Sequence, residues 1–412
     1  MKVTGIIAEY NPFHNGHAYQ IQEARKMTGA DYIVVVMSGD FTQRGIPAII
    51  DKYSRTEMAL KAGADLVIEL PLYYASGSAE FFANGAISIL DKLGVIDSLL
   101  FGSECGDVEL LTDIADILID KKEILDHGIK EKVKTGISYP QARIRTIEEI
   151  VPNAFEHVDA MSQPNNILGF EYIRALKNRN SAILPYTNKR NGSGYHDRMV
   201  MNILSSALAI RSSIEANDSL EMVKDQMPDY VYDILQRNFK KTFPVYNEDI
   251  SALLKYKLLL DAPGGYYNYA DISPDFSDKI EKNLSKYISY NQYCDLLKTK
   301  DITYARVGRC LLHILLNIRK DNLHTYVDND FTFYARMLGF RKNSGELLSQ
   351  IKKNSSIPLI SKLADAKNIL SPLALEMLDA DIQSAHIYDT VVTEKYKQSN
   401  INEFQREIIV ID

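Results

Sequence analysis

The sequence predicts an α/β protein in which a doubly wound parallel sheet is followed by a mainly α-helical domain, and three observations lead to this prediction. Short apolar runs recur at a spacing of about thirty residues. Amphipathic helical segments separate them, and beyond residue 215 the apolar residues follow helical spacing alone. Strands that alternate with helices form right-handed βαβ units, so the first part is expected to be a Rossmann-like sheet.

The predicted strands are rich in leucine and β-branched residues and are apolar at consecutive positions. Both features are typical of strands that are covered on both faces. The four runs are KVTGIIAEY (2–10), DYIVVVMSG (31–39), ADLVIELP (64–71) and SLLFGSE (98–104).

The predicted helices lie between these strands, at residues 17–29, 51–63 and 78–94. Each segment ends at a glycine, the residue that most often terminates a helix, and Asp51 is a candidate N-cap for the second. The second half contains further helical segments without a regular series of strands, at 249–262, 279–298, 304–320 and 371–388.

The length of 412 residues exceeds what one hydrophobic core usually supports. We therefore expect two domains, at residues 1–215 and 216–412, with the boundary between Arg211 and Tyr230. The net charge of −7 argues against a generally basic nucleic-acid coat but leaves room for a local basic face. No N-terminal signal or long apolar run predicts export or a membrane partner, and three widely spaced cysteines predict no disulfide framework. These features favour a cytoplasmic location.

Ligands of open α/β sheets bind beyond the carboxyl ends of the strands, so we expect the site just after residues 10, 39, 71 and 101. NPFHNGH (11–17) follows the first strand and precedes a helix. The free amides of a helix N-terminus bind anions, and His14 and His17 add side-chain donors. Pro12 ends the strand, and Gly16 lets the backbone approach a ligand closely. The sequence thus indicates a triphosphate site whose fixed donors stabilise charge during attack on the α-phosphorus.

Two alternative roles for the histidines remain open. One histidine caps the helix and the other is a buried core residue, or both bind a metal ion with Glu9 or Asp40 as a third ligand.

The motif NPFHNGH resembles the His-x-Gly-His signature of the nucleotidyltransferase superfamily. A second motif of that superfamily, Ser-x-x-x-Ile-Arg, is similar to SSALAIRSSI (205–214), with Ser206, Ile210 and Arg211 at the matching positions. This resemblance implies a fold of the nucleotidyltransferase type and a catalytic role for His14, His17 and Arg211, the arginine reaching the pyrophosphate.

A closer resemblance is carried by residues 34–71, 101–106, 163–172 and 189–197, which are similar to the bacterial tRNA(Met) cytidine acetate ligase family. The resemblance implies an enzyme that activates acetate with ATP, with Mg²⁺ as the default ion, and passes the acetyl group to elongator tRNA(Met). The family's ATP site is carried over onto Ile7, Ala8, Glu9, Tyr10, Asn11, Pro12, Phe13, His14, Asn15, Gly16, His17, Ala18, Tyr19, Gln20, Gly102, Asn165, Asn166, Lys189 and Arg190.

Several of these residues have a structural alternative. Asn165 or Asn166 is also a candidate N-cap, and Ser103 and Glu104 are suited either to ribose or base contacts or to helix capping. The glycine-rich stretch 191–197 is suited to a phosphate or an RNA backbone but also to a simple turn.

Other features bear on substrates. Gln43 and Arg44 follow the second strand and are placed to reach a substrate, whereas His313 lies in an apolar helix and is expected in the core. With no tryptophan in the chain, RNA bases would stack on other residues. Candidate RNA-binding cations, each of which also fits a solvated helix face, are Lys130, Lys132, Lys134, Arg143, Arg145, Lys177, Arg179, Arg306, Arg309, Arg341 and Lys342.

Two other functions are compatible with the same core. It could transfer AMP to a small phosphorylated metabolite, although such enzymes are commonly much shorter. It could also be a non-catalytic module that binds ATP or RNA.

Overall fold

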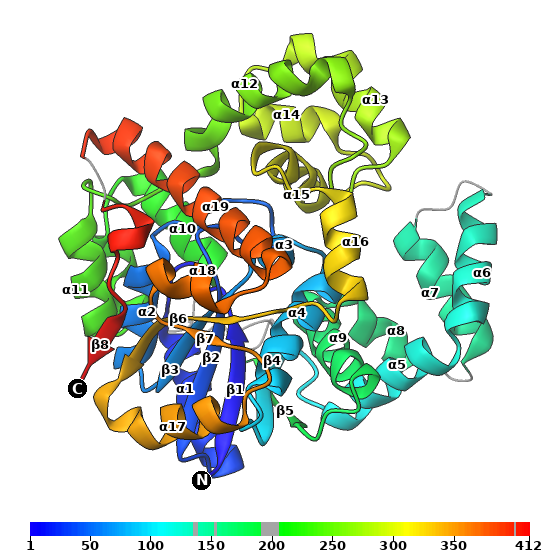
Figure 1. The fold of residues 1–412 in the computed structure, drawn as a ribbon. Coiled ribbons are helices and arrows are strands. Elements are labelled where there is room, and N and C mark those ends of the chain that lie inside the picture. The colour runs from blue at the N-terminus through cyan, green and yellow to red at the C-terminus, as the bar shows by residue number, and fades with distance from the viewer. Residues whose placement is uncertain (135–138, 152–154, 191–205, 399–400) are drawn as a thin grey trace.

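The computed structural model describes residues 1–134, 139–151, 155–190, 206–398 and 401–412. Within these residues one sheet holds eight strands in the order β5-β4-β1-β2-β3-β6-β7, and β8 pairs with β6 (Figure 1). The strands are β1 (Val3–Ala8), β2 (Tyr32–Ser38), β3 (Leu66–Leu70), β4 (Ser98–Ser103), β5 (Leu184–Lys189), β6 (Ala335–Arg341), β7 (Leu359–Ile360) and β8 (Ile409–Ile411).

The first five strands are parallel, which confirms the predicted doubly wound sheet and its four apolar strands. The strand order reverses at β1, which has β2 on one side and β4 on the other. β5 was not predicted. This strand, LPYTNK, lies at the sheet edge with only Thr187 buried, so it carries no apolar run.

The second half is mainly helical, as predicted, and it also contributes β6, β7 and β8, which were not predicted. β6 pairs with β3 in the antiparallel direction, and β7 and β8 both pair with β6. The sheet therefore takes strands from both sides of residue 215. The division into domains 1–215 and 216–412 stays a prediction.

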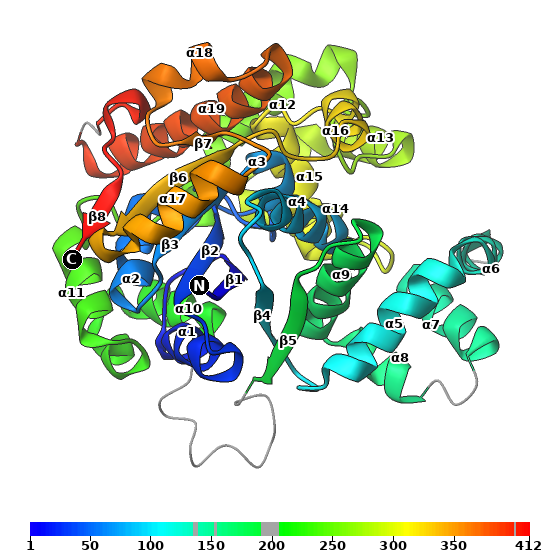
Figure 2. The ribbon, with the colours of Figure 1, turned by 60° about the horizontal axis from the view of Figure 1, so that its bottom comes forward.

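Helices cover both faces of the sheet, and alternating strand residues separate two hydrophobic clusters. Ile33, Val35 and Met37 of β2 pack with α1, α2, α10 and α11. Val34 and Val36 pack instead with α4, α5 and α9. Figure 2 shows α4 and α9 on the opposite side of the sheet from α1 and α2. The helices of this part are α1 (Asn15–Thr28), α2 (Lys52–Lys61), α3 (Leu72–Ala75), α4 (Ala79–Lys92), α5 (Val108–Asp120), α6 (Lys122–Lys134), α7 (Tyr139–Ile150), α8 (Phe155–Ser162), α9 (Pro164–Asn178), α10 (Ala207–Asn217) and α11 (Asp229–Asn238).

Most of the remaining helices form a group beyond the carboxyl ends of the strands with a long helix beside it, whereas the helix at residues 345–354 lies near the opposite end of the sheet (Figure 1). They bury their apolar faces in the same cluster as α4 and α9. They are α12 (Ser251–Asp261), α13 (Pro274–Asn283), α14 (Tyr290–Leu297), α15 (Tyr304–Leu315), α16 (Lys320–Asp328), α17 (Gly345–Asn354), α18 (Ala366–Ile369) and α19 (Pro372–Tyr396). In the described part of the chain, no helix combines the length and apolar character that a bilayer crossing requires.

Candidate active site

A cavity of about 350 Å³ opens at the carboxyl ends of β1 and β4, where the strand order reverses. Doubly wound sheets bind their ligands at this position. Residues in the loops after β1 and β2 line it, as do Phe101 and Gly102 of β4, whereas residues 71–81, which directly follow β3, do not. The chain after β3 is instead buried, and the Leu72 N–H donates to the Asp381 carboxylate of α19 over 2.7 Å.

The two histidines of the first motif form the start of α1. His14 is the N-cap, and its Nδ1 accepts a hydrogen bond from the Gly16 N–H over 3.0 Å. The His17 Nδ1 accepts in turn from the His14 N–H over 3.2 Å. The two rings stack with their centroids 3.7 Å apart, and both line the cavity. Helix capping and cavity lining are therefore combined in the same residues.

Both histidines are held in the neutral state. Burial, assisted by the positive charge of Arg190, lowers the pKa of His14 to about 3. Burial also lowers the pKa of His17 well below its ordinary value, with His14 and Arg190 contributing. Since each Nδ1 accepts a backbone N–H, the proton of each neutral ring lies on Nε2. The pair can thus offer two Nε2–H donors to an anion without carrying charge.

Gly16 packs closely against the capping histidine. A Cβ at this position would lie 2.8 Å from the Cε1 atom of His14, and Gly16 does not line the cavity. Packing against the capping ring is thus one reason for this glycine, and close approach to a ligand stays a prediction.

A buried arginine that the sequence analysis did not identify holds the two loops at the cavity floor. Arg55 of α2 is fully buried and donates to the carbonyl oxygens of Glu9 (2.7 Å), Ser38 (3.0 Å) and Gly39. These carbonyls follow β1 and β2, so one guanidinium fixes the ends of both strands. No local sequence signal distinguishes such an arginine from one on the surface.

The second motif approaches the first from α10. Ser206 is the N-cap of this helix and accepts from the Ala209 N–H, while Ile210 is buried in the core. Arg211 then reaches the loop of the first motif, where its Nη1 donates to the Asn11 carbonyl oxygen. Ser206 and Arg211 both line the cavity, so the fold brings together the three residues expected to be catalytic.

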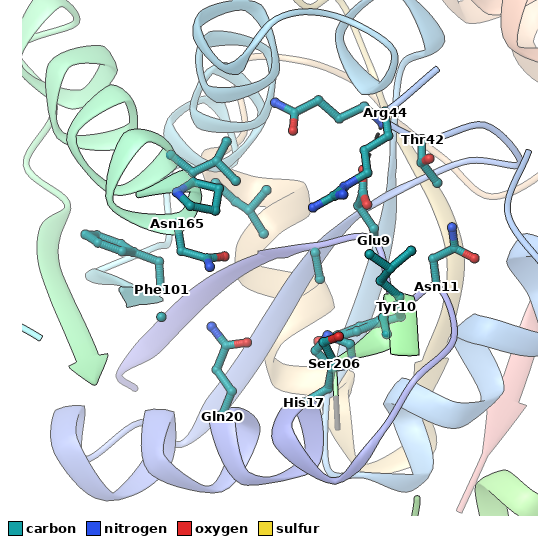
Figure 3. A pocket seen from close by; sticks show the side chains of 18 of the residues that line it. Glu9, Tyr10, Asn11, His17, Gln20, Thr42, Arg44, Phe101, Asn165 and Ser206 are labelled. Atoms are coloured by element: carbon teal, nitrogen blue, oxygen red, sulfur yellow. Dashed lines mark hydrogen bonds between the residues drawn. The ribbon is translucent and has the colours of Figure 1, made fainter. Parts of the chain in front are cut away.

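The opposite end of the cavity is apolar. Phe101 of β4 and Tyr172 of α9 are almost completely buried, with ring centroids 5.6 Å apart. Phe82 and Leu168 complete this wall. Figure 3 shows Phe101 and Asn165 at one end and His17 and Ser206 at the other. A purine at the aromatic end would direct its phosphates toward the histidines.

The loop after β2 contributes polar groups, as predicted. Gln43 and Arg44 both line the cavity, and the Gln43 N–H donates to the Glu9 carboxylate over 2.8 Å. Thr42, which the sequence analysis did not single out, lies beside them.

The segment after β4 is organised by a carboxylate. Glu104 accepts hydrogen bonds from the backbone N–H groups of Asn165 (3.2 Å) and Asn166 (2.8 Å) and thereby caps α9. Asn165 and Asn166 are thus not N-caps, and Glu104 serves helix capping, one of its two expected roles. Ser103 is buried and bonded to Thr187. A Cβ on Gly102 would lie 3.1 Å from Cγ of Arg190, so this glycine makes room for the arginine.

The structure divides the residues expected to bind ATP or act in catalysis. Those that line the cavity are Ile7, Ala8, Glu9, Tyr10, Asn11, His14, His17, Gln20, Gly102, Asn165, Arg190 and Arg211. Those that do not are Pro12, Phe13, Asn15, Gly16, Ala18, Tyr19, Asn166 and Lys189.

Contacts elsewhere in the fold keep several of these side chains away from the cavity. Phe13 is buried in the core, and the Asn15 amide donates to the Asp225 carbonyl oxygen. The Asn166 amide oxygen accepts from the Glu104 and Cys105 N–H groups. Residues 191–197, the expected phosphate or RNA loop, lie outside the described residues.

Asp40, one of the two candidate third ligands of a metal site at the histidines, is engaged by other charges. Asp40 is buried between Lys52 and Arg55, with charged atoms 3.7 and 3.9 Å away. In the residues that the structure describes, no three histidine, cysteine, aspartate or glutamate side chains come together as metal ligands. His313 is a core residue, as expected, and its ring contacts the Ser76 and Ala270 carbonyl oxygens at 2.9 Å.

Most of the candidate RNA-binding cations are engaged in ion pairs, and they lie on separate elements. Lys132, Lys134 and Lys177 pair with Glu149, Glu131 and Asp116. Arg179 pairs with Asp330, and Lys342 pairs with Asp412. Arg306 and Arg309 both pair with Asp271.

Comparison with known proteins agrees with this geometry. The family model of the HIGH Nucleotidyl Transferase family matches residues 1–403. The tRNA(Met) cytidine acetate ligase of Acetivibrio thermocellus is 39% identical over 415 residues and covers 100% of both chains. The protein of the same name from Thermoanaerobacter sp. (strain X514) is 41% identical over 402 residues, with 97% of each chain covered.

A solved structure is similar over the whole length. The crystal structure of Thermotoga maritima TmcAL bound with alpha-thio ATP matches with a TM-score of 0.91 at 31% identity and covers 100% of both chains. The apo structure of the same protein matches with a TM-score of 0.92. From the paired motifs, the cavity at the strand switch point and these full-length similarities, we conclude that the chain belongs to the tRNA(Met) cytidine acetate ligase family of HIGH nucleotidyl transferases.

Proposed function

We propose that this protein activates acetate with ATP and transfers the acetyl group to the N4 amine of the wobble cytidine of elongator tRNA(Met). The observation that carries the proposal is one cavity with neutral imidazole donors at one end and aromatic side chains at the other. This arrangement suits a nucleoside triphosphate, and relatives 39–41% identical over almost the full length carry the ligase name.

The first step forms acetyl-adenylate. One oxygen of acetate attacks the α-phosphorus of ATP, the bond from that phosphorus to the bridging oxygen breaks, and pyrophosphate leaves with the electron pair. Charge grows on the phosphate oxygens, and we expect His14, His17 and Arg211, which line the cavity, to donate hydrogen bonds to them. Mg²⁺ would enter as part of the substrate MgATP, bound mainly by phosphate oxygens, and Glu9 adds a carboxylate to the cavity lining.

The second step transfers the acetyl group. The N4 lone pair attacks the carbonyl carbon, the bond from this carbon to the AMP oxygen breaks, and the amine proton is released to water. AMP is a far better leaving group than the oxide ion of free acetate, which explains why a weak aryl amine can react. In this proposal, elongator tRNA(Met) is the acceptor and the reaction takes place in the cytoplasm.

Acetate-dependent exchange of labelled pyrophosphate into ATP tests the first step. The protein should show exchange that acetate stimulates, and His17→Ala should reduce it by about a hundredfold or more, as expected on loss of a donor to the transition state. Met27→Ala is the matched control because Met27 lies on the same helix and is exposed to solvent.

Circular dichroism would establish that His17→Ala keeps its helical content. Exchange that needs a phosphorylated metabolite in place of acetate would support the adenylyltransferase alternative. Absence of exchange with any acceptor would favour a non-catalytic module, and normal exchange by His17→Ala would remove the basis for the phosphate site.

A further inference from the structure

A second cavity of about 240 Å³ adjoins the nucleotide cavity. The two share three lining residues, Arg44, Leu208 and Arg211, which therefore form a common wall. The second cavity lies between the loop after β2, helix α10 and the helical group that contains α14 and α15. Apart from Arg44 and Arg211 in the shared wall, no residue that lines this cavity was expected from the sequence to have a function.

One face of α10 continues from the first cavity into the second. Leu208, Arg211, Ser212 and Glu215 have the spacing of a single helical stripe, and all four line the second cavity. Leu208 and Arg211 belong to the shared wall, whereas Ser212 and Glu215 belong to the second cavity alone. Glu215 thus lies one helical turn beyond the arginine that serves the nucleotide.

The other walls combine aromatic rings with amides. Tyr246 and Tyr304 supply the rings, and Asn247 and Asn291 supply the amides. The Tyr304 hydroxyl donates to Oδ1 of Asn291 over 2.7 Å, which fixes the orientation of that amide. Among the described residues, the Asn247 side chain has no hydrogen-bond partner. Aromatic rings with hydrogen-bonding side chains are what proteins use to hold an unstacked RNA base.

We propose that this second cavity receives the unstacked cytosine base of the RNA acceptor, with its N4 amine held between Glu215 and the shared wall. The proposal rests on the function proposed above. An attacking amine must come within about 3.5 Å of the acyl carbon, so its base needs a place beside the nucleotide cavity but outside it. The second cavity provides that place, because Arg44, Leu208 and Arg211 line both cavities.

Glu215 gives the cavity a means of selecting cytosine over uracil. An ionised carboxylate only accepts hydrogen bonds, so it pairs with the N4 amine of cytosine and repels the O4 atom of uracil. Asn247 supplies an amide that can pair with another atom of the base edge. Arg44 forms no ion pair within the described residues and is exposed, which suits contact with an adjacent RNA phosphate.

Two assays on the full-length protein separate acceptor binding from acetate activation. The first is acetate-dependent pyrophosphate exchange, and the second is transfer of labelled acetyl to a tRNA(Met) transcript with cytidine or uridine at the wobble position. Glu215→Gln and Asn247→Ala should each lower kcat/KM for transfer about tenfold or more, while exchange stays within about twofold of the unaltered protein. Asn217→Ala is the matched control because Asn217 is exposed on α10 and lines neither cavity.

Binding of an anticodon hairpin, measured by fluorescence anisotropy, tests contact with the base itself. Asn247→Ala should weaken binding of the cytidine hairpin about tenfold and leave binding of a hairpin with an abasic wobble position unchanged. An equal loss for both hairpins, or unchanged transfer in both variants, would overturn the acceptor site. If these variants lost acetate-dependent exchange as well as acetyl transfer, the acceptor site would also be overturned. Absence of acetate-dependent exchange in the unaltered protein would instead contradict the proposed function itself.

Discussion

At the scale of single residues, His14 and His17 combine a structural and a chemical role. Each uses Nδ1 to accept a backbone N–H at the start of α1, which leaves Nε2–H to face a ligand. Burial keeps both rings neutral. A neutral donor is compatible with the neighbouring Arg190, whereas two imidazolium ions stacked 3.7 Å apart would repel each other.

This arrangement predicts how acid affects the fold. The pKa of His14 is about 3 in the folded protein, below its ordinary value of 6.5, so the folded state binds fewer protons than the unfolded state between these values. The stabilisation is complete above pH 6.5 and is lost as the pH falls toward 3. His14→Asn keeps a capping side chain but removes the titrating group. The free energy of unfolding should therefore fall less steeply with acid in this variant, by up to about 1.4 kcal/mol per pH unit.

Urea denaturation at pH 7, 6 and 5 measures this slope for both proteins. Identical slopes would mean that the His14 ring is protonated as readily in the folded chain as in the unfolded one.

At the scale of elements, the loop after β2 connects the nucleotide cavity to the helical group. Gly45 has a φ of +76°, and a Cβ there would overlap the backbone of Gly308 and Arg309 at α15. The Tyr290 hydroxyl of α14 donates to the Gly45 carbonyl oxygen over 2.8 Å. Two helices of the second half thus position the neighbouring Arg44 in the wall shared by the two cavities.

Gly45→Ala should therefore damage both stability and chemistry. The left-handed backbone alone costs about 1–3 kcal/mol for a non-glycine residue, and the overlap with α15 adds to this. We expect a lower free energy of unfolding and reduced acetate-dependent exchange, because a displaced loop moves Gln43 and Arg44. Gly264→Ala is the control, since nothing lies within 4 Å of its added Cβ. Equal stability and exchange in both variants would show that the loop is not held in this way.

Elements that depend on local signals could be predicted from the sequence, whereas those that depend on distant residues could not. β1 to β4 and the Asp51 N-cap were predictable because apolar runs and capping residues are local signals. β6 was not, because its pairing with β3 joins residues more than 260 positions apart and depends on the completed sheet. The capping of α9 by Glu104 is hidden for the same reason, since 61 positions separate it from Asn165.

The residues of the site likewise include some that local motifs predict and others that only the fold identifies. The histidines and Arg211 belong to motifs that a sequence carries openly, whereas Phe101, Tyr172 and Leu168 look like ordinary core residues. Only the fold shows that these apolar side chains line a cavity in addition to packing against each other. Lys189 and Arg190 are adjacent in sequence, but Lys189 ends β5 and packs against Gly106, and only Arg190 lines the cavity.

At the scale of the whole molecule, the C-terminal segment completes the sheet and ties it to α2 through buried charges. Lys52 Nζ lies 2.8 Å from Glu69 and 2.5 Å from Glu403. Arg336 of β6 contacts the same two carboxylates at 2.9 and 2.6 Å. The Lys52 N–H also donates to Asp40 in the loop after β2, so this charge cluster adjoins the loop that carries Arg44.

Glu403→Gln tests whether this closure stabilises the fold. Burial by itself raises the pKa of Glu403, but Lys52 and Arg336 outweigh this and lower it to about 2. The stabilisation is therefore present above the ordinary value of 4.5 and is lost as the pH falls toward 2. Removing the charge leaves buried cations with one carboxylate fewer, which should cost about 3–5 kcal/mol of unfolding free energy at pH 7.

Glu394→Gln is the matched control because its ion pair with Lys397 is exposed. Urea denaturation at pH 7 and pH 4 should show the difference between Glu403→Gln and the unaltered protein shrinking with acid; a difference as small as that of the control at both pH values would mean that the C-terminal segment rests on the sheet without stabilising it.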